Sequence, residues 1–376
     1  MADKGKKAAG TMDYTIYLVV VILVAIGVVM VFSASYLFTG RRAFFNYDAF
    51  FYLKRGGVLA VIGFLVMNLM ANFPYQKLMR LAKPMYGIAV VLLLAVFVFG
   101  KATNGSTRWI PLPIIGQFQP SEVAKVALIM ILAYTIDKHK NILVTWKGFI
   151  QCSLLVGVVA VAVVIGNLST AIIICIIGFG IIFIASPYIM RFVVIGGTGA
   201  GTLVGGLMFM AANNSDNFRA GRFMAWIDPF SDQSRYGFQI INSLYAVASG
   251  GMFGLGIGQS RQKTFLPEAH NDIIFSIICE ELGFVGASIV LLLFGILIWR
   301  GIRVAINAPD IFGSLMAGGI VLLIASQVII NVAVVTNSIV NTGIPLPFIS
   351  YGGTALIVCM GLIGILLNIS RHVKQG

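Results

Sequence analysis

Carboxylates crowd the start of a long apolar run in the C-terminal half of this chain. Asp272 opens the run Asp272–Trp299, and Glu280 and Glu281 follow inside it. The chain is 59% hydrophobic and only 10% charged, and acidic side chains in a membrane-length segment of such a chain are costly and indicate function. The segment therefore points to chemistry in which a carboxylate exchanges a proton.

A helix that begins near Asn271 would place Asp272, Ser276 and Glu280 on one face, with Glu280 roughly 12 Å deeper than Asp272. Asp272 would then lie at the membrane rim and Glu280 would be buried. An alternative for Asp272 is an acid that caps the first helical turn. For Glu280 and Glu281 we expect basic partners on neighbouring spans.

The elements that hold these residues are membrane helices. A mean hydropathy of +0.97 and repeated apolar runs of span length predict an all-α polytopic membrane protein with a single transmembrane domain over residues 1–376. Around Gly166–Ser169 the pattern allows either one broken helix or two short ones. The first run lacks a signal-peptide cleavage pattern and predicts an uncleaved helix. We expect about ten spans, near Ile16–Tyr36, Gly56–Asn72, Met85–Gly100, Ser121–Asp137, Phe149–Ile165, Thr170–Ser186, Met190–Ala211, Asp272–Trp299, Ile311–Val335 and Gly352–Ile369.

Charge distribution predicts the orientation. An even number of spans and basic ends place both tails, residues 1–15 and 370–376, in the cytoplasm, although Arg41, Arg42, Lys54 and Arg55 would then lie outside. The net charge of +13 indicates contact with anionic membrane lipid; the basic residues are dispersed between spans, so nucleic acid is not implied. Four cysteines, all in apolar runs, are interpreted as small core residues.

One connection is far longer than the others. Residues 212–271 form a large extracellular loop between spans 7 and 8, which is typical of a functional loop. Within it, Tyr236–Val247 has the spacing of an interfacial helix. The glycine-rich stretch Gly250–Gly258 lacks the features of a nucleotide-binding loop and predicts a hinge or a close backbone approach to a ligand.

Three motifs now resemble one family. They are Leu266–Phe275 with Glu280–Gly283 after it; Arg108-Trp-Ile110 with Gln119–Lys125; and Thr342–Gly353. Together they are similar to the SEDS family of peptidoglycan glycosyltransferases, the FtsW, RodA and SpoVE type, over nearly the whole chain. The residues of these motifs resemble the FtsW/SpoVE branch more than RodA.

The resemblance implies an inner-membrane enzyme that polymerises lipid II into β-1,4 glycan strands on the outer face and releases undecaprenyl pyrophosphate. It implies that Asp272 is the essential carboxylate. Because one inverting displacement needs one base and pyrophosphate is a good leaving group, Asp272 is our candidate general base. The expected partners are a class B penicillin-binding protein and other division-complex proteins, at the division septum.

The remaining candidate site residues would contact substrate. Positive side chains on the expected outer side could hold the pyrophosphate, and a divalent cation, Mg²⁺ or Mn²⁺, could share that role, although the sequence shows no dedicated metal cage. Glu122 and Lys125 either pair with each other or line the substrate cavity. His270 would tune Asp272 or act as a loop hydrogen-bonding residue. The full set of candidates is Arg108, Glu122, Lys125, Arg219, Arg222, Arg261, Lys263, His270, Glu280 and Ser350.

The chain departs from the family pattern in two places. Asn167 stands where many members carry an aspartate, so an essential acid there is doubtful while a hydrogen-bonding role survives; Val340 replaces a common proline. The segment Gly343–Gly353 is either a re-entrant turn or a substrate-facing surface. Ser350 has no histidine or paired acid in its local sequence, which argues against covalent catalysis.

Other function classes stay open. A lipid II flippase or transporter fits ten spans with polar residues, but the long outer loop with Asp272 favours the enzyme. A scaffolding role would predict that Asp272→Ala keeps function. The RodA and SpoVE roles of elongation and sporulation are alternatives within the family.

Overall fold

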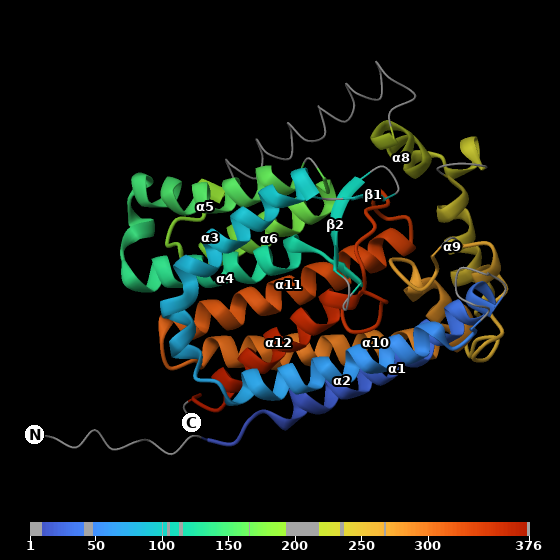
Figure 1. Cartoon of the computed structure of the whole chain (residues 1–376), viewed down its shortest axis with the longest axis horizontal. Coiled ribbons are helices and arrows are strands. Elements are labelled where there is room, and N and C mark those ends of the chain that lie inside the picture. The colour runs from blue at the N-terminus through green and yellow to red at the C-terminus, as the bar shows by residue number, and fades with distance from the viewer. Residues whose placement is uncertain are drawn as a thin grey trace, which may run out of the picture.

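A computed structural model describes residues 10–40, 48–99, 101–103, 106–112, 116–164, 166–192, 218–233, 237–266 and 268–373. These described residues are mostly helical and include one small sheet (Figure 1). The helices are α1 (Tyr14–Gly40), α2 (Phe51–Asn72), α3 (Tyr75–Phe99), α4 (Pro120–Lys138), α5 (Trp146–Val164), α6 (Leu168–Ala185), α8 (Phe218–Ile227), α9 (Gly237–Ser249), α10 (Ile274–Ile306), α11 (Ile311–Val335) and α12 (Gly353–Ser370). Short 3-10 helices are η2 (Ile142–Val144), η3 (Pro229–Asp232) and η4 (Gln262–Thr264).

Every expected span except Met190–Ala211 coincides with a helix; Met190–Ala211 lies almost entirely outside the described residues. Within the described ranges, 8 helices are long and apolar enough to cross a membrane. α4 is also of span length but carries Glu122 and Lys125 in its first half and Asp137 and Lys138 at its end. The uncertain region around Gly166 contains two separate helices, α5 and α6, packed on each other.

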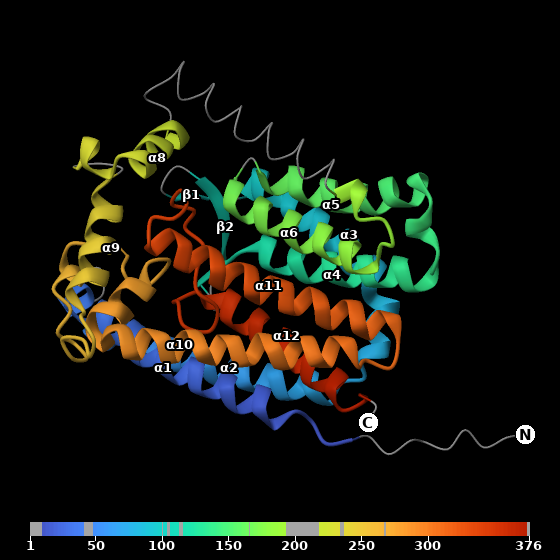
Figure 2. The same cartoon turned by 180° about the vertical axis from the view of Figure 1, so that it is seen from behind.

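The central layer of the bundle consists of α4, α11 and α12, whose residues are mostly buried. α2 packs along α12, α1 along α10, and α6 and α3 against the central layer, as Figures 1 and 2 show from opposite sides. Large apolar side chains such as Leu65, Val91 and Leu154 are exposed on the outer helices. Such an apolar exterior is expected of helices that face lipid.

A three-stranded antiparallel sheet was not expected. Its strands β1 (Lys101–Thr103), β2 (Ser106–Leu112) and β3 (Gly116–Phe118) connect α3 to α4, and β2 pairs with both neighbours. Strand pairing satisfies the backbone hydrogen bonds of a connection too polar to continue the helix. The last strand of the sheet leads directly into the first turn of α4.

The two ends of the described chain meet at one end of the bundle. Gly10 N donates to Arg371 O over 2.8 Å, and Arg300 of α10 forms an ion pair with Asp13 at 2.8 Å. α8 and α9 lie at the opposite end (Figure 1). The loop that precedes Asp272 therefore lies at the end of the bundle opposite both ends of the described chain (Figure 1).

Candidate active site

Asp272 lies in a turn just before α10, half-buried. α10 begins at Ile274, and its N-cap residue is Ile273 without a side-chain cap. The capping role considered for Asp272 is therefore wrong. Its carboxylate instead lies beside the Thr342–Gly353 motif: a Cβ on Gly343 would be 3.2 Å from Asp272 Oδ2.

The Thr342–Gly353 motif forms a folded turn between α11 and α12. Ser350 is buried, and its Oγ accepts a hydrogen bond from Leu346 N over 2.8 Å while Ser350 N donates to Leu346 O over 3.0 Å. This hydroxyl closes the turn that carries Pro345 and Pro347. In the described chain, the contacts of Ser350 are those of a turn residue.

Arg222 of α8 reaches the residue just before the same motif. Its Nη1 donates to Asn341 O over 3.2 Å, and Asn341 Oδ1 accepts from Gly343 N over 3.3 Å. Trp226, one turn further along α8, donates to Asn337 O over 3.1 Å. α8 thus brings a guanidinium to the segment that also borders the Asp272 carboxylate.

His270 is buried in an aromatic group with Tyr52 of α2 and Tyr351. The ring centroids of His270 and Tyr52 are 4.4 Å apart, and His270 O accepts from Tyr351 N over 2.9 Å. Burial lowers the pKa of His270 to about 4, so the imidazole is neutral near pH 7. His270 therefore ties the loop before Asp272 to α2 and to the start of α12.

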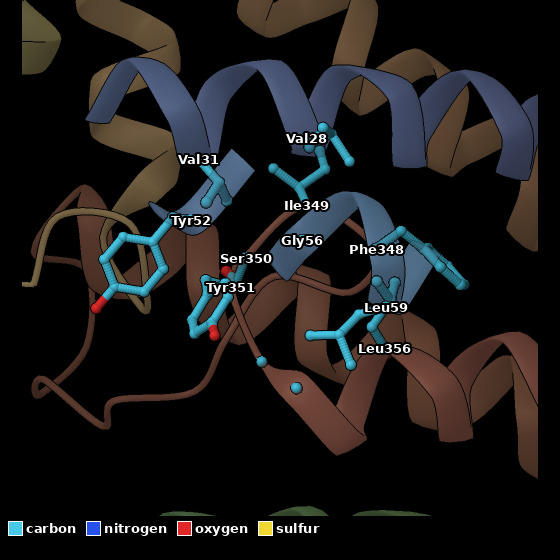
Figure 3. Close-up of a pocket in the computed structure, with 13 residues that line it drawn as sticks. Val28, Val31, Tyr52, Gly56, Leu59, Phe348, Ile349, Ser350, Tyr351 and Leu356 are labelled. Carbon is cyan, nitrogen blue, oxygen red and sulfur yellow. The ribbon is translucent and has the colours of Figure 1, made fainter. Parts of the chain in front are cut away.

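A small pocket of about 20 Å³ opens beside this aromatic group (Figure 3). A volume of that size holds about one water molecule. A sugar does not fit without movement of the walls. The lining residues come from α1, α2 and the turn before α12, and include Val31, Tyr52, Gly56, Phe348, Ser350 and Tyr351.

Glu280 and Glu281 are fully buried and hold the large loop onto the bundle. Glu280 accepts from Ser260 Oγ and from the backbone N–H of Arg261 over 2.9 Å. Glu281 accepts from Ser33 Oγ of α1 over 2.6 Å and forms an ion pair with Lys263 at 3.4 Å.

We call the group made of Ser33, residues 260–263, Glu280 and Glu281 the clasp. The expectation of basic partners on neighbouring spans is wrong, because Lys263 belongs to the loop and the residue from a neighbouring span is a serine. The clasp closes a segment that has Asp272 near its middle.

The glycine-rich stretch approaches helix α10 closely. α10 is broken at Gly283, whose φ is 68°. At this break Leu255 N and Gly256 N donate to Glu280 O and Glu281 O over 2.9 and 3.0 Å, and Phe284 N donates to Gly251 O over 2.9 Å. The loop backbone supplies the hydrogen bonds that the helix loses.

Glu122 and Lys125 form a buried ion pair at 2.9 Å in the first turns of α4, with side chains 5% and 2% exposed. The first of the two expected interpretations, mutual pairing, matches this geometry; contact with substrate stays a prediction. Asn167 is the N-cap of α6 and accepts from Thr170 N over 3.2 Å. It makes the hydrogen bond that was expected to survive the loss of an acid.

The other predicted cationic residues are not all brought to Asp272. Lys263 is committed to the clasp, and Arg261 lies on the exposed surface above it. Arg108 lies on β2 and Arg219 on α8, and their side chains lie outside the described part of the structure. Arg222 is the predicted cation whose contacts place it next to the motif that borders Asp272.

Two polar side chains that contact candidate site residues were not identified from the sequence. Asn331 of α11 donates to Asp272 O over 2.7 Å, and Ser33 of α1 binds Glu281. A polar residue in an apolar span was the signal available for both. Nothing in the sequence paired them with residues so far along the chain.

In the described ranges no group of three or more His, Cys, Asp or Glu side chains is arranged to hold a metal ion. The described side chains around Asp272 therefore do not form a cage for a divalent cation by themselves.

Fold and site together define a multi-pass membrane protein with one half-buried carboxylate at the end of the bundle opposite its described termini. The family model for cell cycle proteins of the FtsW, RodA and SpoVE type matches residues 13–375. The chain is 41% identical to stage V sporulation protein E of Bacillus subtilis over 375 residues, covering 96% of this chain and 98% of that protein. It is 38% identical to the probable peptidoglycan glycosyltransferase FtsW of Geobacter sp. (strain M18) over 367 residues, covering 96% of this chain and 97% of that one.

Solved structures agree. A chain described under "Structural coordination of polymerization and crosslinking by a peptidoglycan synthase complex" has a TM-score of 0.77 and 27% identity, covering 97% of this chain and 99% of that chain. Rod shape determining protein RodA of Thermus thermophilus gives a TM-score of 0.69 and 25% identity, covering 97% and 98%. This chain belongs to the FtsW/RodA/SpoVE family of peptidoglycan glycosyltransferases. It is a multi-pass protein of the bacterial inner membrane.

Proposed function

We propose that this peptidoglycan glycosyltransferase polymerises lipid II on the outer face of the membrane with Asp272 as general base. The observation that carries the proposal is the position of the Asp272 carboxylate, half-buried and beside the backbone of Gly343. Its neighbourhood contains a guanidinium, that of Arg222, which contacts the same segment. One base and nearby positive charge are what an inverting transfer from a pyrophosphate needs.

In the proposed step the 4-hydroxyl oxygen of the acceptor sugar attacks the anomeric carbon of the donor. The bond from that carbon to the pyrophosphate oxygen breaks, the hydroxyl proton moves to the Asp272 carboxylate, and undecaprenyl pyrophosphate leaves. A positioned base typically contributes about 10²–10⁴-fold to the rate. Arg222 would stabilise the negative charge of the leaving group, as a guanidinium does for phosphate oxygens.

The test is polymerisation of labelled lipid II by purified enzyme with its transpeptidase partner. Asp272→Asn should reduce polymer formation by at least about 10²-fold. Glu268→Gln is the matched control, because Glu268 is an exposed acid of the same loop that pairs with Asn271 over 2.8 Å. Polymer from Asp272→Asn at the control rate would refute the base. Movement of lipid II across vesicles without polymer from any variant would favour the flippase alternative.

We propose a divalent cation, Mg²⁺ or Mn²⁺, only as an ion that binds together with the substrate. Mg²⁺ usually keeps several waters and binds substrate phosphates, so the pyrophosphate would hold the ion and the Asp272 carboxylate would stay free to accept the hydroxyl proton. The bound cation would neutralise the leaving pyrophosphate. Chelation followed by addition of Mg²⁺ or Mn²⁺ tests this: full activity in chelator would remove the cation from the mechanism.

The proposed partner is a class B penicillin-binding protein, which would crosslink the strands within the division complex. A solved relative that belongs to a peptidoglycan synthase complex with coordinated polymerization and crosslinking supports this. We favour the division septum because several relatives are named FtsW; the 41% identity to a sporulation protein makes sporulation the second candidate. A fluorescent fusion seen at the septum, the sidewall or the forespore distinguishes division, elongation and sporulation.

A further inference from the structure

Asn331 is a buried amide in the middle of the site, on α11, with 1% of its surface exposed. Its Nδ2 donates to two backbone carbonyls, Asp272 O over 2.7 Å and Ile344 O over 2.8 Å. The two carbonyls belong to segments that lie far apart in the sequence. One side chain therefore joins the turn that carries Asp272 to the motif that borders its carboxylate.

The polarity of these neighbours fixes the orientation of the amide. Both neighbours are acceptors, so only the NH₂ group can face them, and a flipped amide would set its oxygen against two carbonyl oxygens. Asn331 Oδ1 then points away and, within the described part of the chain, has no hydrogen-bond partner. A buried amide that leaves its own oxygen unpaired requires an explanation. The two hydrogen bonds that Nδ2 donates supply one.

The distance between these segments matters for the reaction. Gly343 directly precedes Ile344, and a Cβ there would be 3.2 Å from Asp272 Oδ2. Since Asn331 holds the carbonyls of Asp272 and Ile344 to one nitrogen, it sets how the carboxylate approaches Gly343. A catalytic group displaced by about 1 Å can cost on the order of 10²-fold in rate.

We propose that Asn331 is the positioning residue for the general base: its amide bridge between the Asp272 and Ile344 carbonyls sets the attack geometry of the Asp272 carboxylate. This inference rests on the proposed function of Asp272. It does not require Asn331 to contact the substrate. The bridge acts on the rate of transfer and leaves the affinity for lipid II unchanged.

Two variants of Asn331 and one matched control test the bridge. Asn331→Ala removes it. Asn331→Asp keeps the shape but faces the two carbonyl oxygens with a carboxyl group that lacks the two donors. Asn368→Ala is the control, because Asn368 is also buried, at 4% exposed, and its Nδ2 also holds a backbone carbonyl, Ala71 O, over 2.9 Å. Asn368 belongs to α12 and lies at the end of the bundle where the described termini meet.

The measurements are kcat and KM for lipid II polymerisation together with thermal unfolding in the same detergent. We expect both Asn331 variants to lower kcat by about 10–100-fold while KM stays within about twofold, as expected when only transition-state interactions are lost. Asn368→Ala should keep kcat within about threefold of the wild-type value, with an unfolding temperature comparable to that of the Asn331 variants. A kcat near wild type in Asn331→Asp, or equal kcat losses in Asn331→Ala and Asn368→Ala, would overturn the positioning role.

Asp272→Asn in the same assay separates this inference from the proposed function. If Asp272→Asn is inactive and the Asn331 variants are fully active, the base stands and the bridge is refuted. If Asp272→Asn polymerises at the wild-type rate, both the base and its positioning residue are refuted.

Discussion

At the scale of single residues, Gly343 is a position where both the backbone and the nearest side chain restrict substitution. Its φ is +66°, and an added Cβ would be 3.2 Å from Asp272 Oδ2. Gly343→Ala should therefore lower kcat by about 10-fold or more, because the methyl group moves the carboxylate and strains the backbone. Gly352→Ala, in the same connection, is the control, since its Cβ would meet Ala355 Cβ at an ordinary 3.4 Å. Similar rates for both variants in the polymerisation assay would contradict the prediction.

The Glu122–Lys125 pair gives a second prediction at this scale. If the buried pair is structural, Glu122→Gln or Lys125→Met alone should destabilise the protein by about 3–5 kcal/mol, because a buried charge loses its partner. The double variant should then recover much of that loss and retain activity. Thermal unfolding and polymerisation of the three variants decide the matter; a stable but inactive double variant would show instead that the pair serves substrate.

His270 should contribute to the pH dependence of stability. Its folded pKa, about 4, lies below the ordinary value of 6.5 because of burial. As pH falls through about 6.5 the unfolded chain takes up a proton that the folded protein refuses until about pH 4, so the free energy of unfolding decreases over that interval. His270→Phe removes this titration. Its unfolding temperature should fall less than that of wild type between about pH 7.5 and pH 5; equal slopes would disprove the contribution.

At the scale of elements, the break in α10 depends on a residue without a side chain. Gly283 has a φ of 68°, and a Cβ there would approach Met252 O to 2.6 Å. Gly283→Ala should destabilise the protein by more than about 1 kcal/mol, because both the φ and the space require glycine. Gly295→Ala, also in α10 but with nothing within 4 Å of its Cβ, should be neutral or slightly stabilising. Thermal unfolding of the two variants compares them directly.

The spans were predictable because an apolar run of membrane length has few alternative structures. Asp272 was selected as the candidate base because an acid at the edge of such a run is rare, and because the family resemblance of the three motifs implies an essential carboxylate there. The partners of Asp272 were not predictable: Asn331 and Gly343 are apart from it in sequence, and only packing brings them together. The break at Gly283 was missed because the residues around it keep the composition of a continuous helix.

The interpretation of Glu280 and Glu281 was half right for a similar reason. Their burial followed from helical periodicity, but the identity of their partners depended on how the long loop folds back. The sheet between α3 and α4 was missed because its strands are short, and short polar segments carry little periodicity.

At the scale of the whole molecule, the meeting of the two described ends predicts a labelling pattern. Single cysteines in a cysteine-free background at Lys140, in the exposed α4–α5 connection, and at Thr264, exposed near Asp272's loop, should lie on opposite sides of the membrane. A membrane-impermeant maleimide added to intact cells should label the cysteine at 264 and leave the one at 140 unlabelled until lysis. The reverse pattern would invert the proposed orientation.

The hydrogen bonds between the glycine-rich stretch Gly250–Gly258 and the break in α10 have a kinetic consequence. The backbone amides of Leu255 and Gly256 donate to carbonyls of a membrane helix, so they can exchange with deuterium only when the loop detaches from that helix. Exchange protection reports the stability of the cooperative unit to which an amide belongs. These two amides should therefore exchange as slowly as those of the bundle core, and the segment that contains them should resist proteases that cleave ordinary surface loops.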